Sequence, residues 1–426
     1  MDAPAVPHLF VVKEPEPLGA LFRPHIRDIP HLVNLLASGR PTGTGVILDG
    51  RYLASAAELR DATRTAGKEV VLDSLGVELF APHGYSLSGM KDLPWAFSKR
   101  HTNAALSADE QRVLCDSLAR AAVENRCTAV LAPTRFVQDI ERDEVSRDVE
   151  VSIQLRQSLD RAGGSDIRVY YPLVTRLRVI ASETARQGIL KSLHDGRRAK
   201  AFDSIWIRAV GFDAHNSGPL NLRRYITGVR GFHELGIPVF GDRAGTVGLA
   251  SLAFGITSGI SSGITVGERY DPRALFKGKT GKGFLPAPRV YVGAIGAFMD
   301  RKRATEFLRH ATIKNRFACQ RSCCTDRGLA DTLADPRRHF VVTRSEEVAE
   351  LARVPAPLRA GQYMETWLRP ASDRATQAMQ IEASFEGHRK RLDEWRATLS
   401  AILEEDAGLP SKATRSPLRM PDRKGA

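Results

Sequence analysis

Short apolar segments rich in β-strand residues recur along residues 19–267 and alternate with segments of helical pattern. There are eight: GALFRPHI (19–26), TGVILDG (44–50), KEVVLDS (68–74), CTAVLAP (127–133), IRVYYPL (167–173), SIWIRAVG (204–211), IPVFGD (237–242) and GISSGITVG (259–267). Most are continuously apolar, which is typical of parallel strands buried on both faces. Eight strands alternating with helices predict a (β/α)8 barrel, an α/β fold also known as the TIM barrel. An open doubly wound sheet is the alternative, but its Gly-x-Gly-x-x-Gly turn after the first strand is missing.

Two of the segments between these strands carry helix signals. Ser107 and Glu110 form a capping box at the start of a helix expected to end at Glu124. A second helix is expected from Ser146 to Ala162, where Gly163-Gly164 would end it.

The chain of 426 residues is long enough for such a barrel and further elements. We expect the barrel over 1–272, then a basic loop, an extra strand (289–296) and a zinc-binding element over 273–345. A helical segment over 346–406 would contain one long amphipathic helix from about Ser372 to Glu405. The Pro-, Ser- and Arg-rich tail 407–426 is expected to be disordered.

Composition excludes several classes of protein. Hydrophobic residues make up 42% and charged residues 26% of the chain, as in an ordinary globular protein. No run approaches the ~18–20 apolar residues of a membrane span, so no membrane association is expected. The first residues lack the pattern of a secretory signal, and five cysteines are too few for a disulfide framework. We therefore expect a cytoplasmic protein.

The net charge of +13 is concentrated in two places. Residues 273–316 hold eleven Lys or Arg against two acidic residues, and the tail 407–426 holds five against one. A basic strip on an otherwise balanced chain indicates a polyanionic partner, most simply nucleic acid, whereas the alternative is a solubilising surface. The residues expected to contact the polyanion are Lys277, Lys279, Lys282, Arg301, Lys302 and Arg303.

Three of the five cysteines lie close together, at Cys319, Cys323 and Cys324, and His339 follows. Three thiols and an imidazole make up the four-ligand set of a structural Zn²⁺ ion, although the spacing is not the familiar Cys-x2-Cys. Nearby arginines, Arg321 and Arg327, would favour the thiolate form. The alternative is that these residues are ordinary buried side chains, as we expect for Cys115 and Cys127.

Charged residues follow the predicted strands at their carboxyl ends, where barrel active sites are built. They are Asp49, Asp73, Arg135, Arg176, Asp213, Asp242, Arg243, Glu268 and Arg269. Because carboxylates and arginines dominate, this set favours carboxylate chemistry on a substrate with anionic parts. Structural ion pairs are the alternative for each residue.

A glycine-rich turn, GDRAGTVG (241–248), follows one of the late strands and precedes a helix. Its backbone amides could approach an anion at the start of that helix, or it could be only a tight turn. We predict that Asp242, Arg243, Gly245, Arg269, Lys279 and Lys282 bind substrate or phosphate.

In order along the chain, several of these features resemble the tRNA-guanine transglycosylase superfamily. Leu72-Asp73-Ser74-Leu75-Gly76-Val77 is similar to the family's Asp-Ser-Gly-Gly-Phe strand end, and Ala209-Val210-Gly211 to its Gly-Leu-Ala-Val-Gly stretch. Cys319, Cys323, Cys324 and His339 match its zinc ligands in kind and location, and Glu268 lies near the place of its nucleophilic Asp.

The resemblance implies a (β/α)8 barrel with a zinc site after the last barrel strand. It also implies exchange of a guanine in tRNA or DNA for a 7-deazaguanine through a covalent enzyme–ribose intermediate. Glu268 would then be the nucleophile, and Asp73 would contact the purine-type base and protonate it as it leaves. Prediction from the residues alone agrees on these two carboxylates, because cleavage at a glycosidic carbon needs one group to attack and one acid.

Two other functions stay open at this point. A non-catalytic, zinc-containing, nucleic-acid-binding barrel is favoured by the absence of the family's glycines at the base pocket, where Leu75 stands instead. A metabolic barrel enzyme acting on a phosphorylated small molecule is favoured by the turn 241–248. The sequence also leaves the oligomeric state open, with a homodimer among the alternatives.

Overall fold

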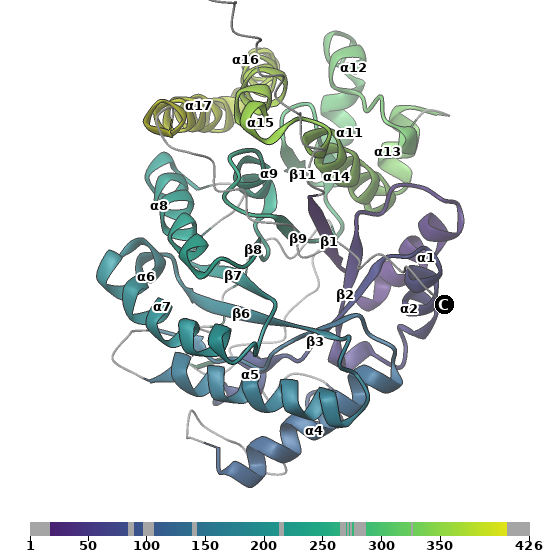
Figure 1. Ribbon diagram of the computed structural model, residues 1–426. Helices are drawn as coiled ribbons and strands as arrows, with labels where there is room; N and C mark the ends of the chain where they lie inside the picture. Colours follow the sequence, from purple (N-terminus) through teal and green to yellow (C-terminus); the bar gives the residue numbers. More distant parts are fainter. Residues whose placement is uncertain are drawn as a thin grey trace, which may run out of the picture.

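A parallel sheet that closes on itself forms the centre of the protein (Figure 1). The computed structural model describes residues 18–83, 89–96, 106–138, 143–212, 217–264, 270, 272, 275–276, 287–324 and 327–406. The strands are β1 (Gly19–Arg23), β2 (Gly45–Asp49), β3 (Glu69–Asp73), β4 (Ala129–Leu131), β5 (Phe136–Val137), β6 (Arg168–Arg176), β7 (Ser204–Val210), β8 (Val239–Gly241) and β9 (Gly259–Gly263). Pairing of β1 with β9 and of β4 with β6 closes the ring, so the predicted (β/α)8 barrel is confirmed.

The predicted run 127–133 contains β4, and a second short strand, β5, follows it outside the predicted range. β4 ends at Leu131, and the chain pairs with β6 again only as β5. Pro133, which has no backbone N–H to donate, lies in the interruption. The ring therefore has eight positions, with β4 and β5 sharing one of them.

The interior of the barrel is filled by side chains. One apolar cluster comes from alternate strand residues: Leu21, Ile47, Val71, Ala129, Leu131, Tyr170, Trp206 and Phe240. The rings of Tyr170, Trp206 and Phe240 stack in series, with centroid distances of 5.1 and 4.2 Å. Because this layer is apolar and closed, the charged groups inside the barrel lie toward its ends.

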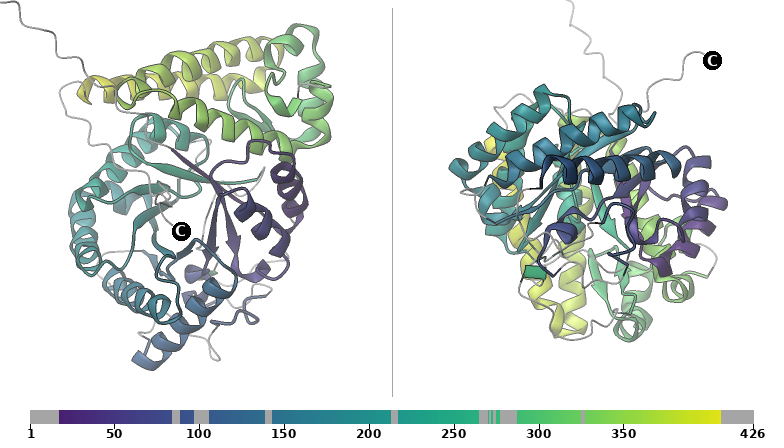
Figure 2. Two further views of the ribbon diagram at one scale, coloured as in Figure 1. Left: turned by 45° about the vertical axis from the view of Figure 1, so that its right-hand side comes forward. Right: turned by 90° about the horizontal axis from the view of Figure 1, so that it is seen from below.

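Helices surround the ring (Figures 1 and 2). Those between the strands are α1 (Ile29–Ala37), α2 (Ala57–Thr65), α3 (Gly76–Phe80), α4 (Ala108–Glu124), α5 (Glu144–Arg161), α6 (Leu177–Ala181), α7 (Glu183–Arg198), α8 (Pro219–Arg230) and α9 (Gly245–Ala253), with 3-10 turns η1 (Ile26–Asp28), η2 (Gly50–Tyr52) and η4 (Gly231–Leu235). The capping box of α4 is confirmed, since the Glu110 amide donates to the Ser107 hydroxyl at 3.3 Å and the Ser107 amide donates to the Glu110 carboxylate at 2.9 Å. Cys115 and Cys127 are buried as expected, and burial raises the pKa of both thiols to about 12.

The C-terminal part of the chain forms a helical layer on one side of the ring (Figure 2, left). Its elements are β10 (Val290–Val292), β11 (Ala297–Met299), α11 (Arg301–Arg309), α12 (Ala311–Phe317), η5 (Ser322–Cys324), α13 (Leu329–Ala334), α14 (Pro336–Ala352), α15 (Ala356–Tyr363), the π-helical η6 (Met364–Leu368), α16 (Arg369–Ile381), η7 (Ala383–Phe385) and α17 (Glu386–Asp406). The strand expected at 289–296 is the first arm of the β10–β11 hairpin.

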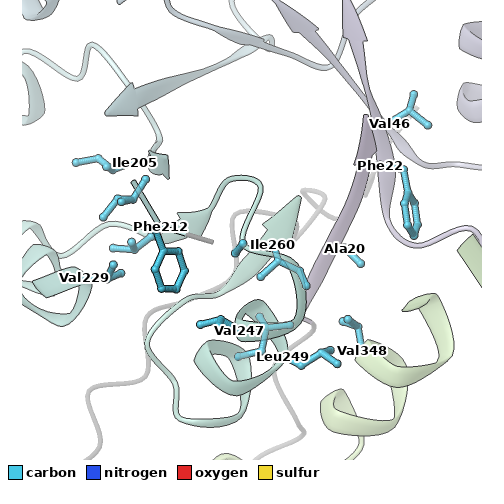
Figure 3. Close-up of a cluster of buried hydrophobic side chains, with 14 of the residues drawn as sticks. Ala20, Phe22, Val46, Ile205, Phe212, Val229, Val247, Leu249, Ile260 and Val348 are labelled. Carbon is cyan, nitrogen blue, oxygen red and sulfur yellow. The ribbon is translucent and has the colours of Figure 1, made fainter. Parts of the chain in front are cut away.

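Helix α14 connects this layer to the barrel. The Phe340 ring of α14 meets the Phe22 ring of β1 edge-on, with centroids 6.2 Å apart. Figure 3 shows Val348 of α14 beside Leu249 of α9, within the buried cluster that includes β1. Packed against β1, α1 and α9, α14 takes the place of the barrel's eighth outer helix. The domain boundary predicted at residue 345 falls inside this helix.

The single helix expected from Ser372 to Glu405 is divided into α16 and α17. Between them Phe385 is buried against Phe307, with centroids 4.9 Å apart, and the two helices pack on each other. Trp395 of α17 donates from its indole nitrogen to the Ser217 carbonyl at 2.7 Å. Phe385 is buried at the break itself, which an amphipathic pattern alone does not reveal.

Two predicted segments, most of the basic loop and the tail 407–426, lie outside the described residues. In the part of the chain that the structure describes, every helix is too short or too polar to cross a membrane.

Candidate functional site

At the carboxyl end of the barrel, two aspartates and two arginines form a buried ion-pair network, which we call the mouth network: Arg23, Asp73, Arg208 and Asp242. Arg23 ends β1 and donates to both aspartates, including two 3.1 Å hydrogen bonds to Asp242. Arg208 of β7 donates to Asp242 from Nε at 2.7 Å, and its Nη2 lies 3.9 Å from Asp73. The Leu75 amide donates to Asp73 at 2.9 Å.

These contacts keep both carboxylates ionised. Burial alone would raise the pKa of Asp73, but the charges of Arg23 and Arg208 hold it below its ordinary value. Burial likewise opposes ionisation of Asp242, but Arg208, Arg23 and Arg243 lower its pKa well below the ordinary value. Asp73 in this state is an acceptor of hydrogen bonds, so its predicted role as a proton donor has no support in the resting protein.

Tyr270 covers the mouth network. Its ring centroid lies 4.5 Å from the guanidinium carbon of Arg208 and 5.2 Å from that of Arg243. Its hydroxyl donates to Glu78 of α3 at 3.2 Å. Burial, together with the charge of Asp73, raises the pKa of Glu78. The space left beside the network is about 10 Å³, which is room for about one water molecule.

The predicted mouth residues fall into several groups. Asp73 and Asp242 lie together, as described, and Arg243 lies against the Tyr270 ring. Asp49 pairs with Arg51, and Arg135 pairs with Asp148 at 2.5 Å, so both belong to local structural pairs. Arg176 lies at the end of β6, on a separate cleft. Four predicted site residues lie outside the described residues, as does Asp213: Glu268, Arg269, Lys279 and Lys282.

The turn 241–248 does not present its helix start to solvent. Gly245 begins α9 and is buried, and its carbonyl accepts a hydrogen bond from Arg344 at 3.2 Å. The Arg243 amide donates to the Ser261 hydroxyl at 2.9 Å. Phosphate binding by Gly245 and Arg243 stays a prediction, and these contacts favour the alternative of a tight turn.

The second candidate site is the Cys3His group, formed by Cys319, Cys323, Cys324 and His339, whose ligand atoms all lie within 4.8 Å of one another. The sulfur of Cys323 lies 3.6 Å from that of Cys319 and 3.5 Å from that of Cys324. The Nδ1 atom of His339 lies 3.4 Å from the sulfurs of Cys323 and Cys324. A tetrahedral Zn²⁺ ion with Zn–S bonds of about 2.3 Å would place its sulfurs about 3.8 Å apart, so the group could hold such an ion.

Local structure orients these four ligands. The 3-10 turn η5 lets two adjacent cysteines face the same centre, which explains the unfamiliar spacing. His339, in the first turns of α14, has Nε2 at 2.7 Å from the Tyr291 carbonyl oxygen. A carbonyl can only accept, so Nε2 carries the proton and Nδ1 offers its lone pair to the centre. The Arg321 amide donates to the Cys319 sulfur at 3.4 Å, which favours a thiolate.

A cleft of about 790 Å³ opens beside the Cys3His group, with Cys319 and His339 on its wall. Cys323 and Cys324 are buried, whereas Cys319 is only partly so. The group is therefore accessible from one side, and its four protein ligands leave no coordination position for a substrate.

Sequence reasoning missed Arg23, Arg208, Glu78 and Tyr270. Arg23 and Arg208 stand inside the apolar runs GALFRPHI and SIWIRAVG. A charge in a strand buried on both faces needs a buried partner, and this signal could have placed both arginines in the network. Tyr270 and Glu78 carry no comparable signal.

No protein-family model matches the chain, and no curated protein sequence matches it. Among solved structures, it is similar to a GH18 chitinase from Pseudoalteromonas aurantia, at 12% identity over 57% of this chain and 93% of that one, with a TM-score of 0.34. It is also similar to the Penicillium canescens endo-1,4-beta-xylanase XylE, at 9% identity over 57% of this chain and 81% of that one, with a TM-score of 0.36. A third is KGPDC from Streptococcus mutans, at 8% identity over 58% and 88%, with a TM-score of 0.32. At these values the similarity carries no argument about activity, and none of the three is a tRNA-guanine transglycosylase.

Proposed function

We propose that the protein is a zinc-containing (β/α)8 barrel of the tRNA-guanine transglycosylase type, which handles a guanine-like base of tRNA or DNA at the carboxyl end of the barrel. The observation that carries the proposal is the Cys3His group, placed after the last barrel strand and attached to the barrel by α14. The resemblance implies a zinc site in this place. When bound there, a Zn²⁺ ion would hold η5 and α14 together.

Asp73 and Glu78 would have different roles at the base, one as hydrogen-bond acceptor and the other as proton donor. Ionised Asp73 would accept hydrogen bonds from the N–H groups of a purine. Glu78, whose pKa is raised by burial, is better suited than Asp73 to hold a proton. Tyr270, which donates to Glu78 and covers Arg208, would have to move aside for a base to reach Asp73.

Glu268 keeps the nucleophilic role predicted from the sequence. Its carboxylate would attack C1′ of the ribose as the glycosidic bond breaks, and the base would leave with the bonding electron pair and take up the proton from Glu78. The incoming base would reverse these steps, releasing Glu268 and returning a proton to Glu78.

The nucleic acid would be held by basic side chains outside the barrel. Arg301 and Lys302 are exposed on α11, whereas Arg303 already pairs with Glu382 at 2.9 Å. We therefore assign the polyanion contact to Arg301 and Lys302, together with the predicted Lys277, Lys279 and Lys282. Neutralising Arg301 and Lys302 should weaken nucleic-acid binding and flatten its salt dependence.

Exchange of radiolabelled guanine into tRNA and into duplex DNA tests the proposed reaction. Wild-type protein should incorporate label, and Asp73→Asn, Glu78→Gln and Glu268→Gln should not, while Glu183→Gln on the exposed surface of α7 serves as a control. Absence of exchange by metal-loaded wild-type protein with both nucleic acids would refute base exchange.

One observation favours a second candidate, a nucleic-acid-binding barrel without catalysis. Both aspartates of the mouth network are paired with arginines, and the adjoining space holds about 10 Å³. Salt-dependent binding of tRNA or DNA without exchange would support this candidate over the first.

A further inference from the structure

A second cleft lies at the carboxyl end of the barrel, apart from the mouth network. Its volume is about 560 Å³, and it opens between the ends of β5, β6 and β7 and the first turns of α8. This volume is typical of small-molecule and cofactor sites. We call it the β6–β7 cleft.

Three arginines line this cleft, and its described lining contains no aspartate or glutamate. Arg176 ends β6, Arg178 lies in the first turn of α6, and Arg224 lies on α8. Within the described part of the chain, no carboxylate forms an ion pair with Arg176 or Arg224. Arg176 donates only a long 3.4 Å hydrogen bond to Gln138, and its Nε atom is buried without an acceptor there.

Arg176 and Arg224 differ in this respect from the arginines of the mouth network, which are paired with aspartates. Two guanidinium groups without a carboxylate partner in the described part of the chain make the potential at this wall positive. Asn221, in the first turn of α8, adds an amide donor to the same wall, near the positive end of the helix dipole. The ligand that neutralises such a wall is an anion with several acceptor oxygens.

The remaining wall of the cleft is aromatic. Phe136 and Phe276 lie with ring centroids 5.7 Å apart, at an interplanar angle of 55°. They pack with Val174 and Val210, so the apolar wall is fixed by the strand ends. Aromatic side chains and guanidinium groups in one cleft suit a ligand with a flat ring at one end and a phosphate at the other.

We propose that the β6–β7 cleft binds a phosphate group through Arg176 and Arg224, with the attached nucleoside against Phe136 and Phe276. The phosphate belongs either to a free nucleotide or to a nucleic-acid strand. The inference goes beyond the proposed function, because it requires neither base exchange nor the Cys3His group.

Direct binding to the full-length protein tests the proposal. The probes are GMP, followed by calorimetric titration, and a fluorescein-labelled single-stranded DNA 12-mer, followed by fluorescence anisotropy across a salt series. The test variant is Arg176→Gln/Arg224→Gln, and the charge-retaining variant is Arg176→Lys/Arg224→Lys. Arg112→Gln/Arg198→Gln removes two exposed arginines from α4 and α7 and is the matched control.

We expect the Gln variant to weaken binding of at least one probe by tenfold or more. The Lys variant should keep most of that affinity, and the control should match wild type. For the 12-mer, loss of two phosphate contacts should flatten the slope of log K against log salt by about 1.4.

Binding of GMP that depends on the two arginines identifies a free nucleotide as the ligand. If only binding of the 12-mer depends on the two arginines, the ligand is a nucleic-acid strand. The proposal is overturned if the Gln variant has wild-type thermal stability and unchanged affinity for both probes. It is also overturned if the wild-type protein binds neither probe. If the Gln variant does not fold, loss of binding in a folded Arg224→Glu variant, with Arg198→Glu as its control, supports the proposal, and retained binding overturns it.

Discussion

The mouth network and the Cys3His group are both compact clusters of polar side chains in apolar surroundings, but they are completed in different ways. In the mouth network, two arginines and two aspartates neutralise one another, and the Ser261 hydroxyl donates a further hydrogen bond to Asp242. In the Cys3His group, contacts of 3.4–3.6 Å link three sulfurs and an imidazole nitrogen, and no lysine or arginine side chain of the described residues lies among them. The first cluster is neutralised by side chains of the protein, whereas the second is a group that could hold a metal ion.

The largest effect should therefore follow removal of the metal. We expect about one zinc ion per chain in the purified protein, measured by elemental analysis, and near-zero zinc in Cys324→Ser. Binding of a structural Zn²⁺ ion contributes about 10–16 kcal/mol to folding in zinc-finger peptides, so chelation should lower the thermal midpoint of the protein markedly.

Cys127→Ser is the control for this prediction, because Cys127 is a buried thiol outside the group. It should keep the zinc content of wild type. Equal and negligible zinc in wild type and Cys324→Ser would contradict the prediction and leave the four residues as ordinary buried side chains.

Breaking the mouth network should have the next largest effect. Arg208→Met leaves two buried carboxylates with one guanidinium, so the free energy of unfolding, measured in urea, should fall by about 3–5 kcal/mol. Arg208→Met/Asp242→Leu removes one charge of each sign and should recover part of that loss. Arg198→Met, which breaks an exposed pair with Asp195, should cost no more than about 1 kcal/mol.

If Arg208→Met cost no more than Arg198→Met, the mouth network would not be the self-contained unit that its geometry indicates. If the double variant were no more stable than Arg208→Met, the loss would lie in the packing of Arg208 against Tyr270 rather than in its charge.

The two clusters differ in how far the sequence reveals them. The Cys3His group lies within 21 residues, so its ligand set is visible as a local pattern. The partners in the mouth network are 34, 50 and 219 residues apart in sequence, so no local pattern indicates them. Asp73 and Asp242 could be placed at the same end of the barrel because both follow apolar strands. Arg23 and Arg208 are indicated only as charges inside buried strands, which does not reveal which aspartates neutralise them.

The fold shows the same contrast between local and distant information. Eight apolar runs predicted the eight barrel positions, because each buried strand is a continuous local signal. That α14 covers β1 could not be predicted, because it depends on contacts such as Phe22 with Phe340, more than 300 residues apart. The break at Phe385 was missed for a related reason, since its partner Phe307 lies on α11.

Acidification should reduce the contribution of the mouth network to stability, by a smaller amount than the loss of Arg208. The pKa values of Asp73 and Asp242 are depressed in the folded state, so below about pH 4 the unfolded chain binds more protons than the folded one. Their contribution is complete above the ordinary pKa of 3.8 and is lost as the pH falls through the folded values. We expect Asp242→Asn to be less stable than wild type at pH 7. Between pH 5 and pH 2 its free energy of unfolding, measured in urea at each pH, should fall by about 2–3 kcal/mol less than that of wild type.

Asp195→Asn removes an exposed carboxylate and is the control, with the pH dependence of wild type expected. Identical acid profiles for Asp242→Asn and wild type would mean that Asp242 titrates normally and that its pairing with Arg208 does not stabilise the ionised form.

The smallest loss of stability should follow removal of the hydroxyl of Tyr270, the residue that covers the mouth network. Tyr270→Phe keeps the ring against Arg208 and Arg243 and removes only the hydroxyl that donates to Glu78 at 3.2 Å. Loss of one such hydrogen bond should lower the free energy of unfolding by about 1 kcal/mol. Tyr52→Phe is the control, since the Tyr52 hydroxyl forms no hydrogen bond within the described residues. Because the ring and the four network residues keep their contacts in Tyr270→Phe, a loss of several kcal/mol would show that the network depends on the hydrogen bond between Tyr270 and Glu78. A loss equal to that of Tyr52→Phe would show that Glu78 does not depend on Tyr270, and would remove the contact that places Glu78 beside the network.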